Sequence, residues 1–545
     1  MKIFVTVLLL LLSCIQWQQL HAAKILCIVG TAAHNNPSWT QPFFEALAGR
    51  GHSLTIVGTS PDPEIKGITH VQIENKYDVI KKQYVDTLGN FKQYWDLKQM
   101  LIWYEALLGN CRSVLEDNLV VDELKANYDL IIYDATYSMD CLMNRLPKYR
   151  DTPVLALSSG KLTVDLLNLM HAEDTINPAR IPHFISQLPV EMNYWQRILN
   201  HVLYIGEAFI RWGVVKPVLN GMLRDGFRNP DVQLMLLNTH PVLDYVQNLP
   251  PNVVEVGGLH IRAESAPLPL NLQEFVNRFP EGIIYINLPQ LQLISSEGVK
   301  AIQYMIKDFS QFGFIWNVKD VQLFRSYHNL RTISVDLQQD ILAKSSMKAF
   351  LTHGDSFGLQ EAIYNAIPVI VLPLLMDQIN NAKRVEERYL GVRLSTDNIT
   401  SHSFSDALKR IVREEIFLDN LHEAQVNFRT RQVKPLNQAV WYAEQLVSEP
   451  QLYKHLSHPQ SREQSYFVSH SFDFLILPVL FVAFFIGNIV MIIVQVTKSQ
   501  TPKTKAKLSA KKSLDKIKVK DNGKEKDRGK ENEKLKQPAK EKKEA

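Results

Sequence analysis

The stretch AFLTHGDSFGLQEAIYNAIPVIVLPLLMDQ, residues 349–378, decides the fold of this chain. It begins with an apolar run at 349–352 that is typical of a buried strand, and a polar turn follows at 353–355. A helical pattern, a second apolar run at 369–372 and a polar loop complete it. This order predicts a parallel α/β sheet with a helix N-terminus at a strand end. Open sheets bind ligands there, and free N–H groups suit an anion such as a diphosphate.

The same alternation of strands and helices continues on both sides of this stretch. Apolar runs at 24–29 and 53–57 flank a helical pattern that opens at Pro42, which predicts a βαβ unit. No GxGxxG fingerprint accompanies it, so a nicotinamide or flavin dinucleotide is not indicated. Further strands are predicted at 128–134, 152–159, 234–238, 253–256, 282–288, 313–318 and 332–335.

A segment rich in glycine and proline, residues 257–270, separates two sets of these elements and is typical of an interdomain linker. At 545 residues the chain is too long for one ordinary domain, and 46% hydrophobic residues suffice for two cores. We therefore predict an α/β protein with two Rossmann-like, doubly wound parallel-sheet domains that face a cleft.

The two ends of the chain carry apolar segments of different length. Residues 1–23 have one charge, Lys2, before an uncharged run, which predicts a secretory signal peptide, with a buried strand as the alternative. Residues 474–496 are uncharged and exceed the roughly 20 residues that cross a bilayer, with a buried core helix as the alternative. Lys498 follows directly, as expected of a cytosolic flank. We predict a type I membrane protein with a lumenal body.

The net charge of +4 is unevenly distributed along the chain. Residues 498–545 hold 18 Lys and Arg against 8 Asp and Glu, so the remainder is mildly acidic. Because this end has no aromatic residue, residues 497–545 are predicted to be a disordered cytosolic tail. Its mixed charges beside a membrane favour a solvated or lipid-headgroup role, and no nucleic-acid partner is expected.

Three cysteines remain outside the signal peptide, too few for a disulfide scaffold. Cys27 is expected in the core, whereas Cys111 and Cys141 could pair, and the sequence leaves this open. Asn398 lies in an Asn-x-Thr triplet that fits a glycosylation acceptor on the lumenal side.

Several segments together resemble the UDP-glycosyltransferases of animals: 50–52 (RGH), 255–261 (EVGGLHI), 338–342 (QQDIL), 349–378 and 428–441 (FRTRQVKPLNQAVW). The order of signal peptide, two α/β halves, one span and a cytosolic tail is similar to that of the endoplasmic-reticulum enzymes. Lys542 and Lys543 match their dilysine retrieval pattern. The resemblance implies a GT-B fold with an acceptor domain at 24–256, a UDP-sugar domain at 271–450 and a juxtamembrane segment at 451–473.

The resemblance also implies a chemistry. A hexose, glucose or glucuronic acid, would pass with inversion from a UDP-sugar to the hydroxyl of a small lipophilic acceptor. A histidine would remove the acceptor proton and an aspartate would orient that histidine. No metal and no cofactor are implied, because a helix N-terminus and a second histidine meet the diphosphate of the co-substrate. Oligomers with itself or with other family members are a further expectation.

Single positions match the residues that perform these roles in the family. For the acceptor side, the resemblance implies that Asp134 orients the base. For the UDP-sugar side, it implies that Gln338 contacts the uracil base and that Glu361 contacts the ribose. His353 and Gly354 would contact the diphosphate. Asp377 and Gln378 would contact the sugar hydroxyls.

Other positions of the same site depart from the family. Asn36 stands where the catalytic histidine is expected, and an asparagine cannot accept a proton at neutral pH. Either His34, two residues earlier, supplies the base through a shifted loop, or the base is absent. Pro289 stands where a glycine turn would approach phosphate, and Val335 where a tryptophan would stack on uracil.

The turn of the opening stretch departs as well. Asp355 replaces a glycine, and Gly358 stands where many members have a serine. A carboxylate at the helix N-terminus either takes the place of the diphosphate or caps the helix while pointing away from the ligand. The alternative to a working transferase is therefore an impaired member that binds a lipophile or a partner protein at the membrane.

Overall fold

The structure, a computed structural model, describes residues 22–29, 37–58 and 65–72, much of 100–144, most of 152–456, and 474 and 476–521. Within 152–456 the gaps lie at 171, 173–174, 224–225, 227–229, 290, 319–326, 376, 397–398 and 455. The predicted signal peptide, except its last two residues, and the retrieval signal at Lys542 and Lys543 lie outside the described residues. Contacts divide the chain into two units, Met1–Arg462 and Glu463–Ala545.

The first half of the body is built on a seven-stranded sheet in which every described pairing is parallel. Its strands are β1 (Lys24–Ile28), β2 (Ser53–Gly58), β3 (Ile68–Gln72), β4 (Leu130–Asp134), β5 (Val154–Ser158), β6 (Leu234–Leu237) and β7 (Val253–Glu255). They lie in the order β3-β2-β1-β4-β5-β6-β7. The order reverses between β1 and β4, which is where doubly wound sheets bind ligands.

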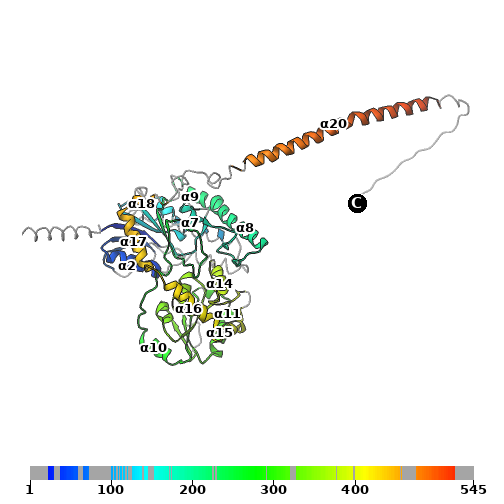
Figure 1. The fold of residues 1–545 in the computed structure, drawn as a ribbon. Coiled ribbons are helices and arrows are strands. Elements are labelled where there is room, and N and C mark those ends of the chain that lie inside the picture. The colour runs from blue at the N-terminus through cyan, green and yellow to red at the C-terminus, as the bar shows by residue number, and fades with distance from the viewer. Residues whose placement is uncertain are drawn as a thin grey trace, which may run out of the picture. The chain divides into compact units, whose positions relative to one another are not determined.

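The second half repeats this plan with a six-stranded parallel sheet (Figure 1). Its strands are β8 (Ile283–Asn287), β9 (Gly313–Asn317), β10 (Leu330–Ile333), β11 (Met347–Thr352), β12 (Val369–Val371) and β13 (Gly391–Arg393). The order β10-β9-β8-β11-β12-β13 reverses between β8 and β11. Two doubly wound halves are therefore confirmed, and the stretch 349–378 begins in the central strand of the second.

Helices cover both sheets and form four apolar cores with them. In the first half they are α2 (Pro37–Gly49), η2 (Ala135–Tyr137), α6 (Asp140–Met143), α7 (Val164–Leu169), α8 (Tyr194–Ile210), η4 (Arg211–Val215) and α9 (Lys216–Met222). The others of the body are α10 (Leu270–Asn277), η5 (Leu291–Leu293), α11 (Ser296–Asp308), α12 (Gln338–Leu342), α13 (Ser356–Tyr364), α14 (Asp377–Glu387), α15 (Ser401–Arg413), α16 (Ile416–Arg429), α17 (Pro435–Ser448) and α18 (Pro450–Lys454).

The positions of the cysteines in the first half agree with the sequence-based expectations. Cys27 is fully buried in β1, as predicted. Cys111 and Cys141 form a disulfide, which answers the question that the sequence left open.

Two predictions about helices need correction. Pro42 was expected to open the first helix, but α2 begins at Pro37 and holds Pro42 inside. Pro37 provides the N-terminal proline, whose missing N–H costs nothing in the first turn. Helix α17 was assigned to the UDP-sugar domain, but it packs on α2 of the first half, as Figure 1 shows.

The RGH motif explains why α17 lies there. Arg50 donates from Nη1 to Oε2 of Glu444 on α17 at 2.7 Å, and Nε2 of His52 lies 3.5 Å from the other carboxylate oxygen. The Glu444 side chain is 9% exposed and that of His52 is 1% exposed, whereas the Arg50 side chain is 44% exposed, so the carboxylate is buried and the guanidinium reaches solvent. The motif thus ties the C-terminal end of the body to its first βαβ unit.

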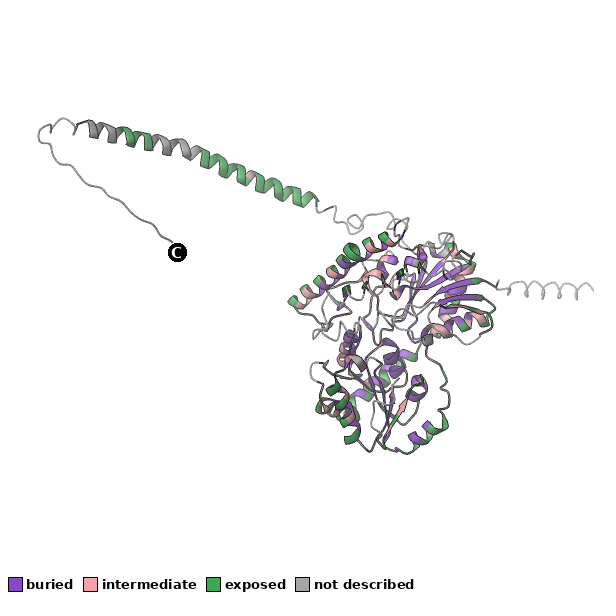
Figure 2. Ribbon diagram, turned by 180° about the vertical axis from the view of Figure 1, so that it is seen from behind, coloured by how far each residue is buried: buried purple, intermediate pink, exposed green. Residues whose placement is uncertain are grey.

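The second unit is a single described helix, α20 (Ile476–Asp521). Its segment Ile476–Lys498 has a mean hydropathy of 2.7 and none of it is buried, so it is not a core helix (Figure 2). It is the one candidate membrane span among the described residues. The helix continues through Asp521, past residue 497 where the predicted disordered tail begins. Lysine, alanine and leucine there are all good helix formers.

Candidate functional site

The turn after β11 places a histidine at the switch point of the second sheet. His353 is 5% exposed, and Gly354 has a φ of +89° that favours glycine. A Cβ on Gly354 would lie 2.6 Å from Cγ1 of Val371, so a side chain does not fit there. Nδ1 of His353 is buried and has no hydrogen-bond partner among the described residues.

Asp355 is the N-cap of α13. Its Oδ2 accepts a hydrogen bond from the Gly358 N–H at 3.0 Å, and its Oδ1 lies 3.4 Å from Nε2 of His353. The carboxylate therefore covers the N-terminus of α13 on the side of His353. This is the position where an anionic ligand would meet free N–H groups.

Gly358 is matched to this carboxylate. A Cβ built on Gly358 would lie 3.0 Å from Oδ1 of Asp355 and 3.3 Å from Cε1 of Phe350. A serine at 358 would thus press on the carboxylate, so the two departures at 355 and 358 fit each other sterically.

Gln338 and Glu361 are brought together, as the family resemblance implies for a nucleoside pocket. Nε2 of Gln338 donates to Oε2 of Glu361 at 2.7 Å, while its Oε1 accepts from Asn287 at 2.6 Å. Nε2 of His260, from the interdomain segment, lies 3.3 Å from Oε1 of Glu361. Oε2 of Glu361 therefore has a hydrogen-bond partner, and Oε1 lies near the His260 ring.

Asp377 and Gln378 begin α14 at the far end of the stretch. Oε1 of Gln378 accepts from the N–H groups of Leu374 and Leu375 at 2.9 and 2.8 Å. Asp377 accepts from Nδ2 of Asn381 at 3.2 Å. Burial raises the pKa of Asp377, and the ammonium of Lys161 opposes this rise.

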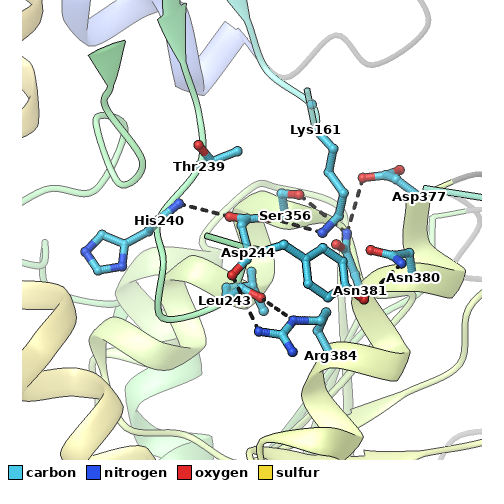
Figure 3. A network of polar contacts seen from close by, with 12 residues as sticks. Lys161, Thr239, His240, Leu243, Asp244, Ser356, Asp377, Asn380, Asn381 and Arg384 are labelled. Carbon is cyan, nitrogen blue, oxygen red and sulfur yellow. Dashed lines mark hydrogen bonds and ion pairs between the residues drawn. The ribbon is translucent and has the colours of Figure 1, made fainter. Parts of the chain in front are cut away.

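Lys161 belongs to the first half and lies beside Asp377 of the second half (Figure 3). It follows β5, is 9% exposed, and donates to Oδ1 of Asp244 at 3.1 Å. From α14, Arg384 donates to the Leu243 carbonyl at 3.2 Å, and its guanidinium lies 4.4 Å from the Tyr245 ring centroid. These residues join the halves beside Asp377, and sequence reasoning missed them because they lie in separate segments without a shared motif.

Asp134 ends β4 at the switch point of the first sheet. Its Oδ1 accepts from the Thr136 N–H at 2.9 Å, and burial raises its pKa to about 6. His34, Asn36 and the glycosylation triplet's Asn398 lie outside the described residues, so their relation to the site stays a prediction.

An aromatic contact brings the two halves together next to these switch points. Trp39 in the first turn of α2 and Phe357 in the first turn of α13 have ring centroids 6.3 Å apart, and both are buried. The ring of His260 meets Phe357 edge-on at 5.2 Å. The N-terminus of α13 therefore faces protein from the first half as well as its own capping carboxylate.

The other two positions that are predicted to depart from the family pattern, Pro289 and Val335, are exposed to solvent. Val335 is 61% exposed, and its side chain offers no aromatic ring on which a base could stack. Pro289 follows β8 in a turn, next to the fully buried Leu288. Among the described residues, no cluster of three His, Cys, Asp or Glu could hold a metal ion.

Known proteins resemble this chain in sequence. Residues 63–504 match the family described as UDP-glucoronosyl and UDP-glucosyl transferase. UDP-glucosyltransferase 2 of Dactylopius coccus is 25% identical over 462 residues, which cover 78% of this chain and 84% of that protein. UDP-glucuronosyltransferase 1A9 of Homo sapiens is 26% identical over 436 residues, 78% of each chain.

Solved structures share the fold. A UDP-glucosyltransferase from Polygonum tinctorium superimposes with a TM-score of 0.53 at 15% identity, covering 78% of this chain and 99% of that one. The glycosyltransferase VinC does so with a TM-score of 0.52 at 16% identity, with the same coverage. The two doubly wound halves are thus a GT-B fold, and the family match over most of the length shows that this chain belongs to the UDP-glucuronosyl and UDP-glucosyl transferase family.

Proposed function

We propose that this chain binds a UDP-sugar at the switch point of its second half and transfers the hexose, with inversion, to the hydroxyl of a small lipophilic acceptor. The observation that carries the proposal is that three polar residues follow one another at that point: His353 comes directly after β11, Glu361 lies on α13 and Asp377 begins α14. In this proposal Gln338 and Glu361 hold the nucleoside, and Asp377 with Gln378 holds the sugar. UDP-sugar is a co-substrate, and neither metal nor cofactor takes part.

The diphosphate would bind at the turn after β11. His353 supports this role, because its buried Nδ1 has no partner among the described residues and could donate to a phosphate oxygen. Gly354 supports it because its positive φ turns the backbone at that point. Oε2 of Glu361 would exchange Gln338 for a ribose hydroxyl, whereas Oε1, which lies near His260, could accept from a ribose hydroxyl directly.

Acceptor deprotonation would take place in the first half. A carboxylate at Asp134 with a pKa of about 6 is ionised at neutral pH and can orient and charge an imidazole. The proposed base is His34, which lies outside the described residues, in place of Asn36.

A second function is favoured by one contact, the cap that Asp355 forms on α13. The chain would then be an impaired member that keeps the scaffold and binds a lipophile or a partner protein. At about 4 Å, two unit charges of the same sign repel by about 4 kcal/mol at an effective dielectric constant near 20. The Asp355 carboxylate would therefore oppose the diphosphate at the position that it already fills.

Thermal unfolding of the full chain with and without UDP separates the two functions. The transferase predicts stabilisation by UDP that His353→Ala removes and that the exposed change Asp419→Asn leaves intact, because a ligand of the folded state raises its stability. Hexose transfer from UDP-glucose or UDP-glucuronic acid to a phenol must accompany it. Absence of any shift at saturating UDP would leave the impaired member as the explanation.

We also propose that the body lies in the lumen of the endoplasmic reticulum and the C-terminal end in the cytosol. The apolar, unburied segment of α20 supports a single span, and the lysines of its second part support a cytosolic end. The disulfide between Cys111 and Cys141 agrees with an oxidising compartment for the body.

A further inference from the structure

An apolar face on the first half lies exposed along α8 and η4. It consists of Tyr194, Trp195, Ile198, Val202, Ile205, Phe209, Trp212 and Val214, here called the α8 face. Trp195 is 75% exposed and Trp212 is 70% exposed. From Trp195 to Trp212 they are spaced by three or four residues, which puts them on one side of the helix, and Figure 2 shows exposed positions along its length.

No Asp, Glu, Lys or Arg of the α8 face is exposed, and its exposed histidine is His201. The charged residues within 194–217 are Arg197, Glu207, Arg211 and Lys216, and each is buried or half-buried. Soluble monomers rarely expose a contiguous apolar patch of this kind, and such patches mark sites of interaction with proteins or membranes.

The opposite side of α8 is held by buried polar contacts. Nε2 of His183 lies 2.9 Å from Oε2 of Glu207, with both side chains at most 1% exposed. One turn later, Nε of Arg211 lies 3.1 Å from Oδ1 of Asp165. Rotating the helix to hide its apolar side would break these pairs at a large desolvation penalty. The α8 face is therefore presented rigidly to the outside.

We propose that the α8 face docks on the surface of a lipid bilayer. This inference rests on the proposed span, because the segment 457–475 joins the body to α20 and reaches roughly 65 Å at full extension. A bilayer is then always within reach of the body. An uncharged apolar stripe with Trp and Tyr rings suits the boundary between headgroups and acyl chains, where such rings bury their body and keep their polar edge wet.

A second copy of the chain is the competing occupant. A stable interface needs about 800 Å² from each partner, with a polar rim and about ten hydrogen bonds. The α8 face offers a single helix with few polar groups, whereas a bilayer requires no such rim. The span also holds the bilayer close without help from another molecule.

Tryptophan quenching tests the proposal on the full chain in phosphatidylcholine vesicles, with and without lipids brominated near the top of the acyl chain. The signal of Trp195 and Trp212 is the difference between wild type and the Trp195→Phe/Trp212→Phe variant. The matched control is Trp441→Phe, since Trp441 is 51% exposed on α17 and lies outside the α8 face. We expect bromine to quench more than half of the Trp195 and Trp212 signal, and little of the Trp441 signal.

The outcomes separate docking from anchoring. If bromine quenches Trp195 and Trp212 no more strongly than Trp441, while alkaline carbonate does not extract the chain from the membrane, the docking proposal is overturned and the span is retained. Release by carbonate overturns the span, and the docking proposal fails with it. In a third outcome, bromine does not quench the two tryptophans, but their emission changes when the protein is diluted in lipid. The α8 face would then contact a second copy of the chain, which also overturns the proposal.

Discussion

Replacing Asp355 by glycine removes the carboxylate that covers the N-terminus of α13. The cap itself is worth little in this comparison, because glycine at an N-cap costs only a few tenths of a kcal/mol. The negative charge of Asp355 should affect the free energy of UDP binding more strongly than the cap affects stability. If the diphosphate binds about 4 Å away, relief of the repulsion reaches about 4 kcal/mol, which is up to about 700-fold in the dissociation constant of UDP. Partial exposure and salt reduce this value, so we expect a gain of at least tenfold.

The assay is titration of the purified full chain with UDP by calorimetry at low and high salt, with uridine as the comparison ligand. Uridine lacks the diphosphate, so its affinity should not change. Asp355→Asn keeps a side-chain cap without the charge and should reproduce most of the gain. A gain for UDP below twofold, or an equal gain for uridine, would refute the view that Asp355 occupies the diphosphate position.

The steric match between Asp355 and Gly358 gives a second prediction, which concerns the stability of variants at these two positions. A Cβ at 358 would lie 3.0 Å from Oδ1 of the carboxylate, so Gly358→Ser should destabilise the wild type. In the Asp355→Gly background the same change should be tolerated better. Equal loss of melting temperature in both backgrounds would show that the two positions are independent.

Three further predictions concern other parts of the chain. The pKa of Asp134 is raised from 3.8 to about 6, so the folded state holds its proton more tightly and ionised Asp134 destabilises the fold above about pH 6. Asp134→Asn should therefore raise the melting temperature more at pH 7.5 than at pH 3.5 while lowering hexose transfer; a pH-independent shift would contradict this. Glu444→Gln removes the charged partner of Arg50 and should cost about 1 kcal/mol of stability, measured by thermal scanning, whereas the exposed Glu423→Gln should change nothing measurable. Asn398→Gln should abolish a glycosidase-sensitive gel shift of the protein made in cells, and an unchanged shift would place the glycan elsewhere.

Much of the fold follows from local patterns. Strands such as 283–287 and 347–352 are apolar runs bounded by turn residues, and alternation with helical patterns predicts parallel sheets without any long-range information. The stretch 349–378 also predicts its own site, because His353 and Glu361 belong to one βαβ unit and Asp377 begins the helix that follows it.

The sequence by itself determined the two doubly wound halves, the apolar segment of α20 and the residues at the strand ends, since each depends on neighbours in the chain. Only the tertiary structure decided that Lys161 meets Asp244 beside Asp377, and that α17 returns to α2 through Glu444. It also decided which side of α8 stays uncovered. These contacts join segments distant along the chain, and packing of the two halves, rather than any local periodicity, selects them.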